Sequence, residues 1–479
     1  MNRNELVNVF LALEKKYGLN SIEIDGFHPW IYTRFFVFQE ILTLESKDAI
    51  TVNKKDFFLH INDVLSAVFR KKSPLKKADI CFISHRGRVM IDGVYECRFT
   101  DDLAEVFQNS ITLEHISRSY PNFKPTKTQN IAYSDLIVIK SHLYGIFNKY
   151  VFFRKFKRIH LKLTELFSEP FMELNHEIET DIKINKWVYE MAIMYFSYKS
   201  RYKNYEKFLL KTSPKLIVET VGYNKNNMII NEIAKKIGIT TIELAHGIRT
   251  SQYLAYSYPD DEHILQFPDK VFCYSDICKE HMACPIKAEN IVVTGYAFFE
   301  KQVKKFNEKY KEDSNIKRLI FLSPNHSNRE LYSKFALDIN ERLSPQGWKI
   351  VFKLHPTECS NWKQNFPLLV NSTIEIIDNP ATSIYEIFSK GTALVTSTLT
   401  TALFEGFGLG LKAFIYDIIS DEDIDVVEKL CKDGYCEIIE DANGLCDALK
   451  NIGNYVEKSP FWKSDVLDNI IKEIYLVLN

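Results

Sequence analysis

Three short segments in the second half of the chain combine side chains that can bind anions or move protons. They span residues 244–247, 353–356 and 397–406. Each follows a short apolar, β-branched run of the kind that forms a buried strand. Because ligands of open α/β sheets bind outside the carboxyl ends of the strands, these side chains are placed to meet a ligand. Together the segments suggest a site for a phosphorylated, sugar-bearing molecule.

The last segment offers hydroxyl groups at the start of a predicted helix. They belong to Ser397, Thr398, Thr400 and Thr401. Such hydroxyls, together with free backbone N–H groups and the positive end of the helix dipole, would hold a phosphate without a metal ion. Glu405, one to two turns into the helix, could accept hydrogen bonds from ribose hydroxyls. The alternative is a helix-capping cluster followed by an ordinary surface glutamate.

The middle segment ends a second predicted strand. His355 could donate a hydrogen bond to a phosphate oxygen or a base carbonyl, and Lys353 alternates onto the same face and adds charge. Pro356 fixes the turn, where a missing N–H costs nothing. Ser323 and Asn325 follow the first strand of the second half, in a loop expected over the phosphates. A structural histidine beside a strand-ending proline is the alternative.

The first segment supplies a candidate general base. His246 follows a strand, Gly247 allows close backbone approach, and imidazole is suited to proton transfer near neutral pH. Glu219, at the end of its own strand, and Asp92 are rival candidates for this base. A turn residue without chemistry is the alternative for His246 and for Asp92.

Composition excludes several classes of protein. The chain has 479 residues, of which 46% are hydrophobic and 26% charged, and its net charge is −1. These values are typical of a globular protein, and no basic field indicates nucleic acid as a partner. The nine cysteines fit no common zinc spacing, so we expect buried thiols in a reducing cytoplasm and no metal. We find neither a signal-peptide core nor an apolar run long enough to span a bilayer.

The order of apolar runs predicts an α/β protein of two Rossmann-like domains that face a central cleft. Strand–helix–strand patterns define an acceptor-side domain at 1–300, with a helical N-terminal extension, and a nucleotide-sugar-binding domain at 316–479. A nearly all-polar stretch at 300–318 is the predicted linker. A hairpin should turn at 92–93, and residues 100–210 read as mostly helical.

One predicted helical stretch, 140–162, mixes basic and aromatic residues. Such a segment could rest on an anionic membrane or guide a polyanionic acceptor, although a solvated helix face has the same pattern.

The order of His-Gly, His-Pro and a Ser/Thr cluster with a following Glu resembles bacterial GT-B glycosyltransferases of capsule and lipopolysaccharide assembly. These include polysialyltransferases, Kdo transferases and the CDP-glycerol polymerase group. The resemblance covers residues 210–420 best. Segment 25–30 with Arg34, and segment 82–86, are also similar to uncharacterised polysaccharide-cluster proteins. We expect His85, Arg86 and Gly247 on the acceptor side.

The resemblance implies a GT-B-like fold and a metal-independent transfer. It places His355, Ser397 and Thr398 on the donor phosphate and makes His246 an acceptor-side catalytic residue. Bacterial sialyltransferases carry an acidic pair followed by glycine, which 23–26 and 91–93 match poorly. The choice of base among His246, Glu219 and Asp92 therefore stays open.

We expect an enzyme that moves a sugar from a CMP-, CDP- or UDP-linked donor to a cell-surface polysaccharide or a lipid-linked glycan. No cofactor is expected, and the site of action would be the cytoplasm or the inner face of its membrane. One alternative is an isomerase like the UDP-sugar 2-epimerases, which share the two domains and the His-Pro element but carry Ser-Gly-Gly where this chain has Thr398-Leu399-Thr400. The other is a catalytically inactive nucleotide-sugar-binding scaffold.

Overall fold

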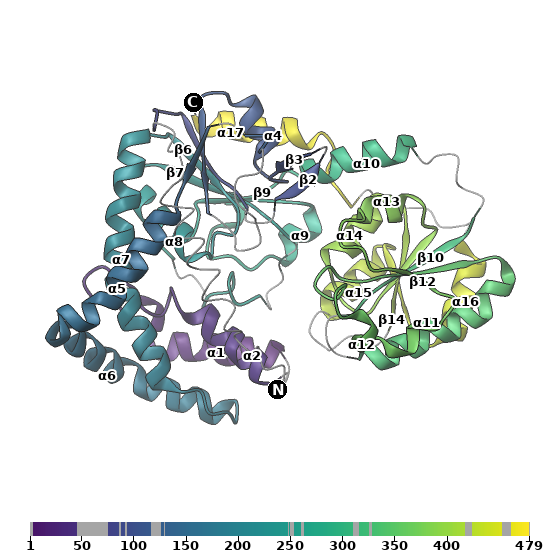
Figure 1. Cartoon of the computed structure of the whole chain (residues 1–479), viewed down its shortest axis with the longest axis horizontal. Coiled ribbons are helices and arrows are strands. Elements are labelled where there is room, and N and C mark those ends of the chain that lie inside the picture. Colours follow the sequence, from purple (N-terminus) through teal and green to yellow (C-terminus); the bar gives the residue numbers. More distant parts are fainter. Residues whose placement is uncertain are drawn as a thin grey trace.

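Two lobes, each built on a parallel sheet, make up the computed structural model of the chain (Figure 1). It describes residues 3–45, 75–85, 88–91, 93–115, 126–128, 130–247, 249, 253–259, 263–309, 316–324, 328–416, 424–452 and 461–478. Three residues predicted for the site, Arg86, Asp92 and Asn325, lie outside the described residues.

The first lobe contains a seven-stranded parallel sheet in the order β5-β4-β1-β6-β7-β8-β9. Every residue of its central strands β1 and β6 is buried, because helices cover both faces of the sheet. The strands of this sheet are β1 (Ile80–Ile83), β4 (Ser110–Glu114), β5 (Ile131–Tyr133), β6 (Leu216–Glu219), β7 (Thr240–Leu244), β8 (Lys270–Cys273) and β9 (Ile291–Val293).

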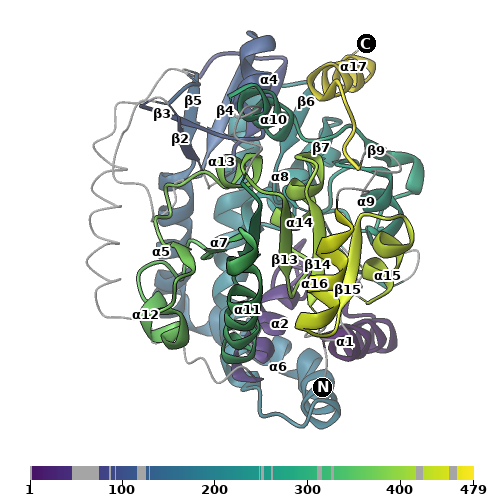
Figure 2. The same ribbon diagram turned by 90° about the vertical axis from the view of Figure 1, so that its right-hand side faces the viewer.

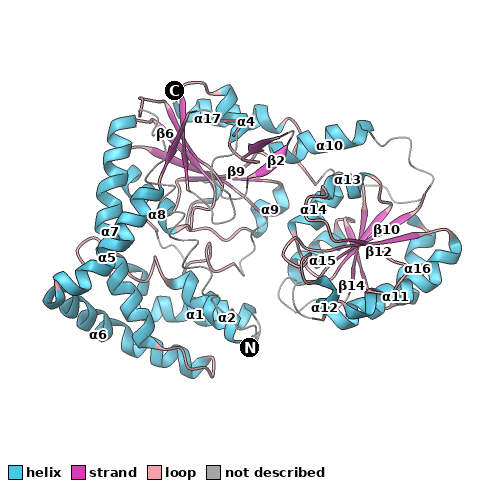
Figure 3. Ribbon diagram, viewed as in Figure 1, coloured by secondary structure: helices cyan, strands magenta, loops and turns pink. Residues whose placement is uncertain are grey.

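The second lobe contains a six-stranded parallel sheet in the order β12-β11-β10-β13-β14-β15, seen nearly end-on in Figure 3 with helices around it. Figure 2 shows this lobe in front of the first. Its strands are β10 (Arg318–Leu322), β11 (Lys349–Lys353), β12 (Glu375–Ile377), β13 (Ala393–Thr396), β14 (Lys412–Tyr416) and β15 (Cys436–Ile439).

Helices pack on both sheets and join the lobes. Those of the first lobe are α1 (Arg3–Tyr17), α2 (Arg34–Glu45), α4 (Asp101–Val106), α5 (Asp135–Val151), α6 (Phe153–Glu177), α7 (Ile184–Thr212), α8 (Lys225–Lys236) and α9 (Asp276–His281). The remaining α-helices are α10 (Ala297–Lys309), α11 (Arg329–Leu343), α12 (Trp362–Asn365), α13 (Ile384–Ser389), α14 (Thr401–Gly408), α15 (Ile424–Lys432), α16 (Ala442–Lys450) and α17 (Val466–Leu478). In the part of the chain that the structure describes, we find no helix long and apolar enough to cross a bilayer.

Residues 100–210 are mostly helical, as predicted, but two strands that were not predicted, β4 and β5, also lie within them and extend the first sheet. Both strands are short, with five and three residues, so the longer helical segments dominate the sequence pattern. The polar stretch predicted as a linker is helical over its first part, where α10 exposes its charged face to solvent. The hairpin is confirmed: β2 (Val89–Ile91) pairs with β3 (Val94–Glu96) across a two-residue turn.

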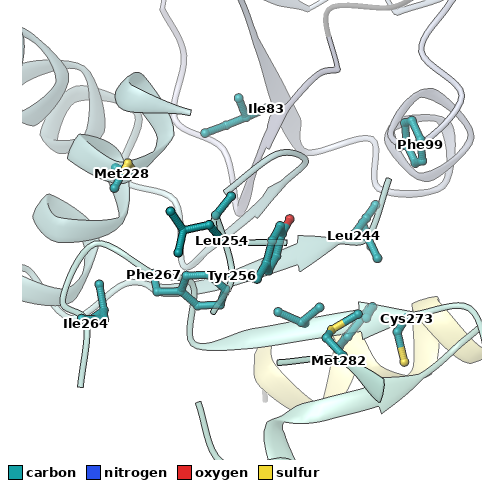
Figure 4. Packing of buried hydrophobic residues seen from close by; sticks show 14 of the residues in the cluster. Ile83, Phe99, Met228, Leu244, Leu254, Tyr256, Ile264, Phe267, Cys273 and Met282 are labelled. Carbon is teal, nitrogen blue, oxygen red and sulfur yellow. The ribbon is translucent and has the colours of Figure 1, made fainter. Parts of the chain in front are cut away.

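A buried ion pair docks the N-terminal helices on the first lobe. The guanidinium of Arg34 donates to the carboxylate of Glu14 at 2.6 and 2.9 Å and to the carbonyl oxygens of Leu254 and Ser257. Both charged side chains are buried, and Trp30 Nε1 donates to the same carboxylate at 2.7 Å. Trp30 and Arg34, two of the residues that carry the resemblance to polysaccharide-cluster proteins, therefore have a structural role. Figure 4 shows Leu254 and Tyr256 of the anchored loop packed beside Phe267 and near β7.

The C-terminal segment returns to the first lobe. Tyr475 of α17 contacts Phe107 with ring centroids 5.4 Å apart, and Val466 packs on Gly295 so closely that a Cβ there would lie 2.5 Å from Cγ2 of the valine. Figure 1 shows α17 beside α4. The described residues of the predicted second domain thus include a last helix that packs on the first lobe.

Candidate functional site

A cavity of about 570 Å³ lies between the two lobes. One side is formed by strand β2, by Arg98 just after the hairpin, and by α10. The other side is formed by the carboxyl ends of β10 and β11, the segment 380–385 and the start of α14. Five residues predicted for the donor site line this cavity: Ser323, Lys353, His355, Pro356 and Thr400.

The charged side chains that line the cavity are all basic. They are Arg98, Lys305 and Lys353, with the imidazole of His355 beside them. Among the described residues that line the cavity, none is an aspartate or a glutamate. Apolar side chains, including Met90, Phe298 and Phe306, complete the wall. This lining suits an anion that carries a ring.

Hydrogen bonds hold His355 just beyond the carboxyl end of β11. Its backbone N–H donates to Ser323 Oγ at 2.8 Å, and that hydroxyl donates to Glu358 Oε2 at 2.7 Å. Glu358 is itself buried and paired with Arg329 at 3.0 Å. The hydroxyl of Ser323 therefore joins two strand ends. His355 Nδ1 accepts from the backbone N–H of Thr357, which favours the tautomer with the proton on Nε2, a donor suited to a phosphate oxygen.

Lys353 lies behind this histidine. Its ammonium donates to the carbonyl oxygen of Leu354 at 2.9 Å, and burial lowers its pKa. A cation with one hydrogen bond still has two donors, so an anion in the cavity would restore part of its lost hydration.

The hydroxyl cluster at the end of β13 is only partly in the cavity. Thr400 lines it and caps α14, its Oγ1 accepting from the backbone N–H of Leu403 at 3.3 Å. Ser397 is buried, and the Oγ1 of Thr398 is buried without a hydrogen-bond partner among the described residues. Neither residue belongs to the cavity lining, and Thr401, the first residue of α14, does not either.

Glu405 of α14 lies behind the cavity wall. The hydroxyl of Tyr385 donates to its Oε1 at 2.7 Å, so an aromatic ring of the lining stands beside the carboxylate. Burial raises the pKa of Glu405 to about 7, although the Tyr385 hydrogen bond and the charge of Arg98 lower it. This glutamate supports Tyr385 in the present arrangement of the lobes.

Sequence reasoning missed Arg98. This arginine lines the cavity from the first lobe, lies over the ring of Phe298 at 5.8 Å, and has a buried Nε without a hydrogen-bond partner in the described structure. No strand end or motif marks it in the sequence, because the hairpin β2–β3 brings it to the cavity.

A second cluster lies at the carboxyl ends of β6 and β7. Glu219 and Glu243 stand opposite each other in the strand register, both fully buried. Their carboxylates converge on Gly222, where an added Cβ would lie 2.5 Å from Glu243 Oε2 and 3.2 Å from Glu219 Oε1. Burial, and then the charge of Glu243, raise the pKa of Glu219 well above its ordinary value. Burial raises the pKa of Glu243 to about 7 against the hydrogen bond from Tyr256.

His246 belongs to this second cluster. Its Nδ1 lies 3.7 Å from Glu243 Oε1, and its Nε2 accepts from the guanidinium of Arg249. Burial, and then the charge of Arg249, lower the pKa of His246 well below 6.5, so the ring is neutral at physiological pH. The ring of His85 lies 5.8 Å away, and Gly247 packs beneath Arg249. The structure thus brings His85, Glu219, His246 and Gly247 together.

The two clusters are separated by aromatic side chains. His85 contacts Phe99 at 5.4 Å between ring centroids, and Phe99, next to Arg98, stacks on Tyr296 at 5.2 Å. None of Glu219, Glu243 and His246 lines the cavity. In the described part of the chain, no group of three His, Cys, Asp or Glu residues could hold a metal ion.

Comparison with known structures settles the fold. The structure is similar to UDP-GlcNAc 2-epimerase from Methanocaldococcus jannaschii, with a TM-score of 0.50 and 13% identity over 83% of this chain and 99% of that chain. Two parallel sheets, of seven and six strands, define the architecture of this chain. The chain has a GT-B-like fold.

Weaker similarity extends to a polymerase and a galactosyltransferase. The wall teichoic acid polymerase TagF gives a TM-score of 0.43 with 14% identity over 93% of this chain and 99% of that chain. The lipopolysaccharide outer core galactosyltransferase WaaB gives 0.42 with 11% identity over 83% of this chain and 99% of that chain. No protein-family model matches the sequence, and no curated protein matches it either. Identities this low bear on the fold alone, so the reaction has to be inferred from the residues of the site.

Proposed function

We propose that the protein is a glycosyltransferase that takes a sugar from a nucleotide-activated donor, linked to CMP, CDP or UDP. The observation that carries this proposal is the cavity between the lobes, whose charged lining groups are all basic. Arg98, Lys353 and His355 would hold the phosphate of the donor, and Thr400 at the start of α14 would add a hydroxyl. Basic side chains would supply the positive charge that a metal ion supplies elsewhere, so we expect metal-independent transfer.

In this mechanism a base takes the proton of the acceptor hydroxyl, and the oxygen of that hydroxyl attacks the anomeric carbon of the donor sugar. The bond between that carbon and the phosphate oxygen breaks, and the electron pair leaves with the nucleotide. Fixed cations at the cavity stabilise the charge that develops on the leaving phosphate.

His246 is the base we favour. A neutral imidazole has a nitrogen lone pair that can take a proton, and the low pKa of His246 keeps it neutral at physiological pH. Glu219 is less suited, because its raised pKa keeps the carboxyl protonated. Since His246 lies outside the cavity lining, the lobes would have to move and Arg249 would have to release the ring before transfer.

For the acceptor we propose a cell-surface polysaccharide or a lipid-linked glycan, of the kind built in capsule or lipopolysaccharide assembly. For location we propose the cytoplasm, where nine free cysteines would stay reduced. Ser397, Thr398, Thr401 and Glu405 remain proposed donor contacts for a closed arrangement of the lobes.

Epimerisation of a nucleotide sugar is the second candidate, because an epimerase shares the fold. The products distinguish the two reactions: transfer releases a free nucleotide, whereas epimerisation leaves the nucleotide attached to an altered sugar. An inactive binding protein would bind nucleotide and release none.

Thermal denaturation with CMP, CDP and UDP tests the donor site. A bound nucleotide stabilises the folded state, so we expect one of the three to raise the melting temperature, and His355→Ala to abolish that rise. His281→Ala, which alters a histidine on α9 outside the cavity lining, is the matched control. If no nucleotide shifts the melting temperature, the proposed donor site is wrong.

A further inference from the structure

Helix α5 is packed with its apolar face outward. Its buried residues are Ser141, Gly145 and Asn148, which face α7. Ser141 Oγ donates to Ser200 Oγ at 3.0 Å, and a Cβ at Gly145 would lie 2.8 Å from the carbonyl oxygen of Ile193. A surface helix of a globular protein normally buries its apolar face against the protein core. The arrangement of α5 therefore leaves an apolar surface without a partner in the described part of the chain.

Large apolar side chains gather where α5 ends and α6 begins. Phe147 is 61% exposed, Tyr150 69% and Val151 67%, and the exposure continues through Phe152 at 53% and Phe153 at 61%. Phe152 is the single residue between the two helices. We call residues 143–158 the α5–α6 corner. Single exposed apolar residues are common, but a contiguous group of this kind marks an interaction site.

The charges around the α5–α6 corner are of one sign. Between 140 and 162 the sequence has seven lysines and arginines and no aspartate or glutamate. Arg154, Lys155, Lys157 and Arg158 lie on the first turns of α6 and are exposed. On the same helix Phe156 and Ile159 are buried, so the cations project away from the protein.

We propose that the α5–α6 corner docks on a bilayer that contains anionic phospholipid. The exposed aromatic and aliphatic side chains would enter the boundary between headgroups and acyl chains, and the lysines and arginines would contact the headgroup phosphates. A second copy of this chain is a poorer partner, because it would bring like charges together. The inference goes beyond the proposed function, since it needs neither a donor nor an acceptor.

Sedimentation of the full chain with vesicles tests the proposal. We compare vesicles of phosphatidylcholine with vesicles in which part of the lipid is phosphatidylglycerol. We expect binding to the anionic vesicles only, weakened by salt. Arg154→Gln with Lys157→Gln should lower the partition coefficient by roughly 25-fold, a factor of about five for each cation near the surface.

The apolar part of the α5–α6 corner is tested by Tyr150→Ser with Phe153→Ser, for which we expect at least a tenfold loss. Matched controls are Leu476→Ser, at an exposed apolar residue of α17, and Lys207→Gln with Lys211→Gln, at the far end of α7. Both controls should bind like the unaltered protein, and thermal denaturation verifies that every variant folds. Absence of binding to anionic vesicles overturns the proposal. So does equal loss in the controls, or a dimer in solution that Tyr150→Ser with Phe153→Ser dissociates.

Discussion

At the scale of single residues, Arg98 is the side chain that links the two lobes to one ligand. It comes from the first lobe, whereas Lys353 and His355 come from the second, and all three line the same cavity. Its aromatic neighbour Phe298 packs against the guanidinium, and the buried Nε–H has no hydrogen-bond partner among the described residues. A bound phosphate would accept from this donor.

Arg98→Gln should therefore weaken nucleotide binding. A hydrogen bond to a charged group contributes about 1.5–3 kcal/mol, so we expect the dissociation constant of the stabilising nucleotide to rise by roughly 10- to 150-fold. Titration calorimetry measures this change. Arg98→Lys keeps the charge, so its affinity for the nucleotide should lie between those of the unaltered protein and Arg98→Gln. Lys349→Gln, at the far end of β11, should leave the affinity unchanged. Equal affinity of Arg98→Gln and the unaltered protein would remove Arg98 from the site.

The raised pKa of Glu243 predicts how the free energy of unfolding depends on pH. Its pKa is about 7 in the folded protein, above the ordinary value of 4.5. Between these values the unfolded chain has lost the proton and the folded protein still holds it, so stability falls as pH rises from 4.5 to 7 and then levels off. The slope is on the order of 1.4 kcal/mol per pH unit for this group.

Glu243→Gln removes the titrating group and should flatten this fall. Denaturant unfolding at pH 5 and pH 8 measures the difference between the two proteins, which should favour the variant more strongly at pH 8. Glu165→Gln changes an exposed carboxyl of α6 and should leave the pH dependence as it is. A parallel pH dependence in Glu243→Gln and the unaltered protein would show that Glu243 ionises normally.

At the scale of elements, the apolar runs predict most strands of both sheets, because a strand covered on both faces must be apolar throughout. Thus β6, β7, β11 and β13 lie at the predicted positions. The short strands β4 and β5 are not predicted, since they take their place only by pairing with β1 and with each other. Prediction of the site is limited in the same way. His355 can be predicted because it follows a recognisable strand, whereas Arg98 cannot, because the β2–β3 hairpin brings it to the cavity.

The N-terminal helices depend on one buried contact. Arg34 joins Glu14 of α1 to the carbonyl oxygens of Leu254 and Ser257, so its loss leaves a buried carboxylate without its opposite charge and removes the arginine donor from both carbonyl groups. We expect Arg34→Met to lower the free energy of unfolding by about 3–5 kcal/mol. Adding Glu14→Leu removes the unpaired charge and should recover part of the loss. Denaturant unfolding of the single and double variants checks this, and an Arg34→Met protein of unchanged stability would contradict it.

At the scale of the whole molecule, Trp462 connects the lobes. Its indole N–H donates to the carbonyl oxygen of Phe404 in the second lobe at 2.7 Å. Its ring stacks on Phe299 of α10 at 4.3 Å and lies 5.3 Å from Tyr274 of the first lobe. The indole packs directly against the backbone at Gly408, where an added Cβ would lie only 2.6 Å from Trp462 Cδ1. This close contact holds the ring in place.

Trp462→Ala should uncouple the two lobes. Removing a packed aromatic ring costs about 3–5 kcal/mol, and here that cost falls on the contact between two lobes, each of which has its own sheet. We therefore expect calorimetry to show two separate unfolding transitions in place of one, and the proposed transfer to slow, since His246 and the cavity must approach each other. Trp462→Phe keeps the ring contacts and loses only the hydrogen bond to Phe404, so it should lower stability by about 1 kcal/mol and keep the lobes coupled. A single transition in Trp462→Ala, at the temperature of the unaltered protein, would show that the lobes are joined elsewhere.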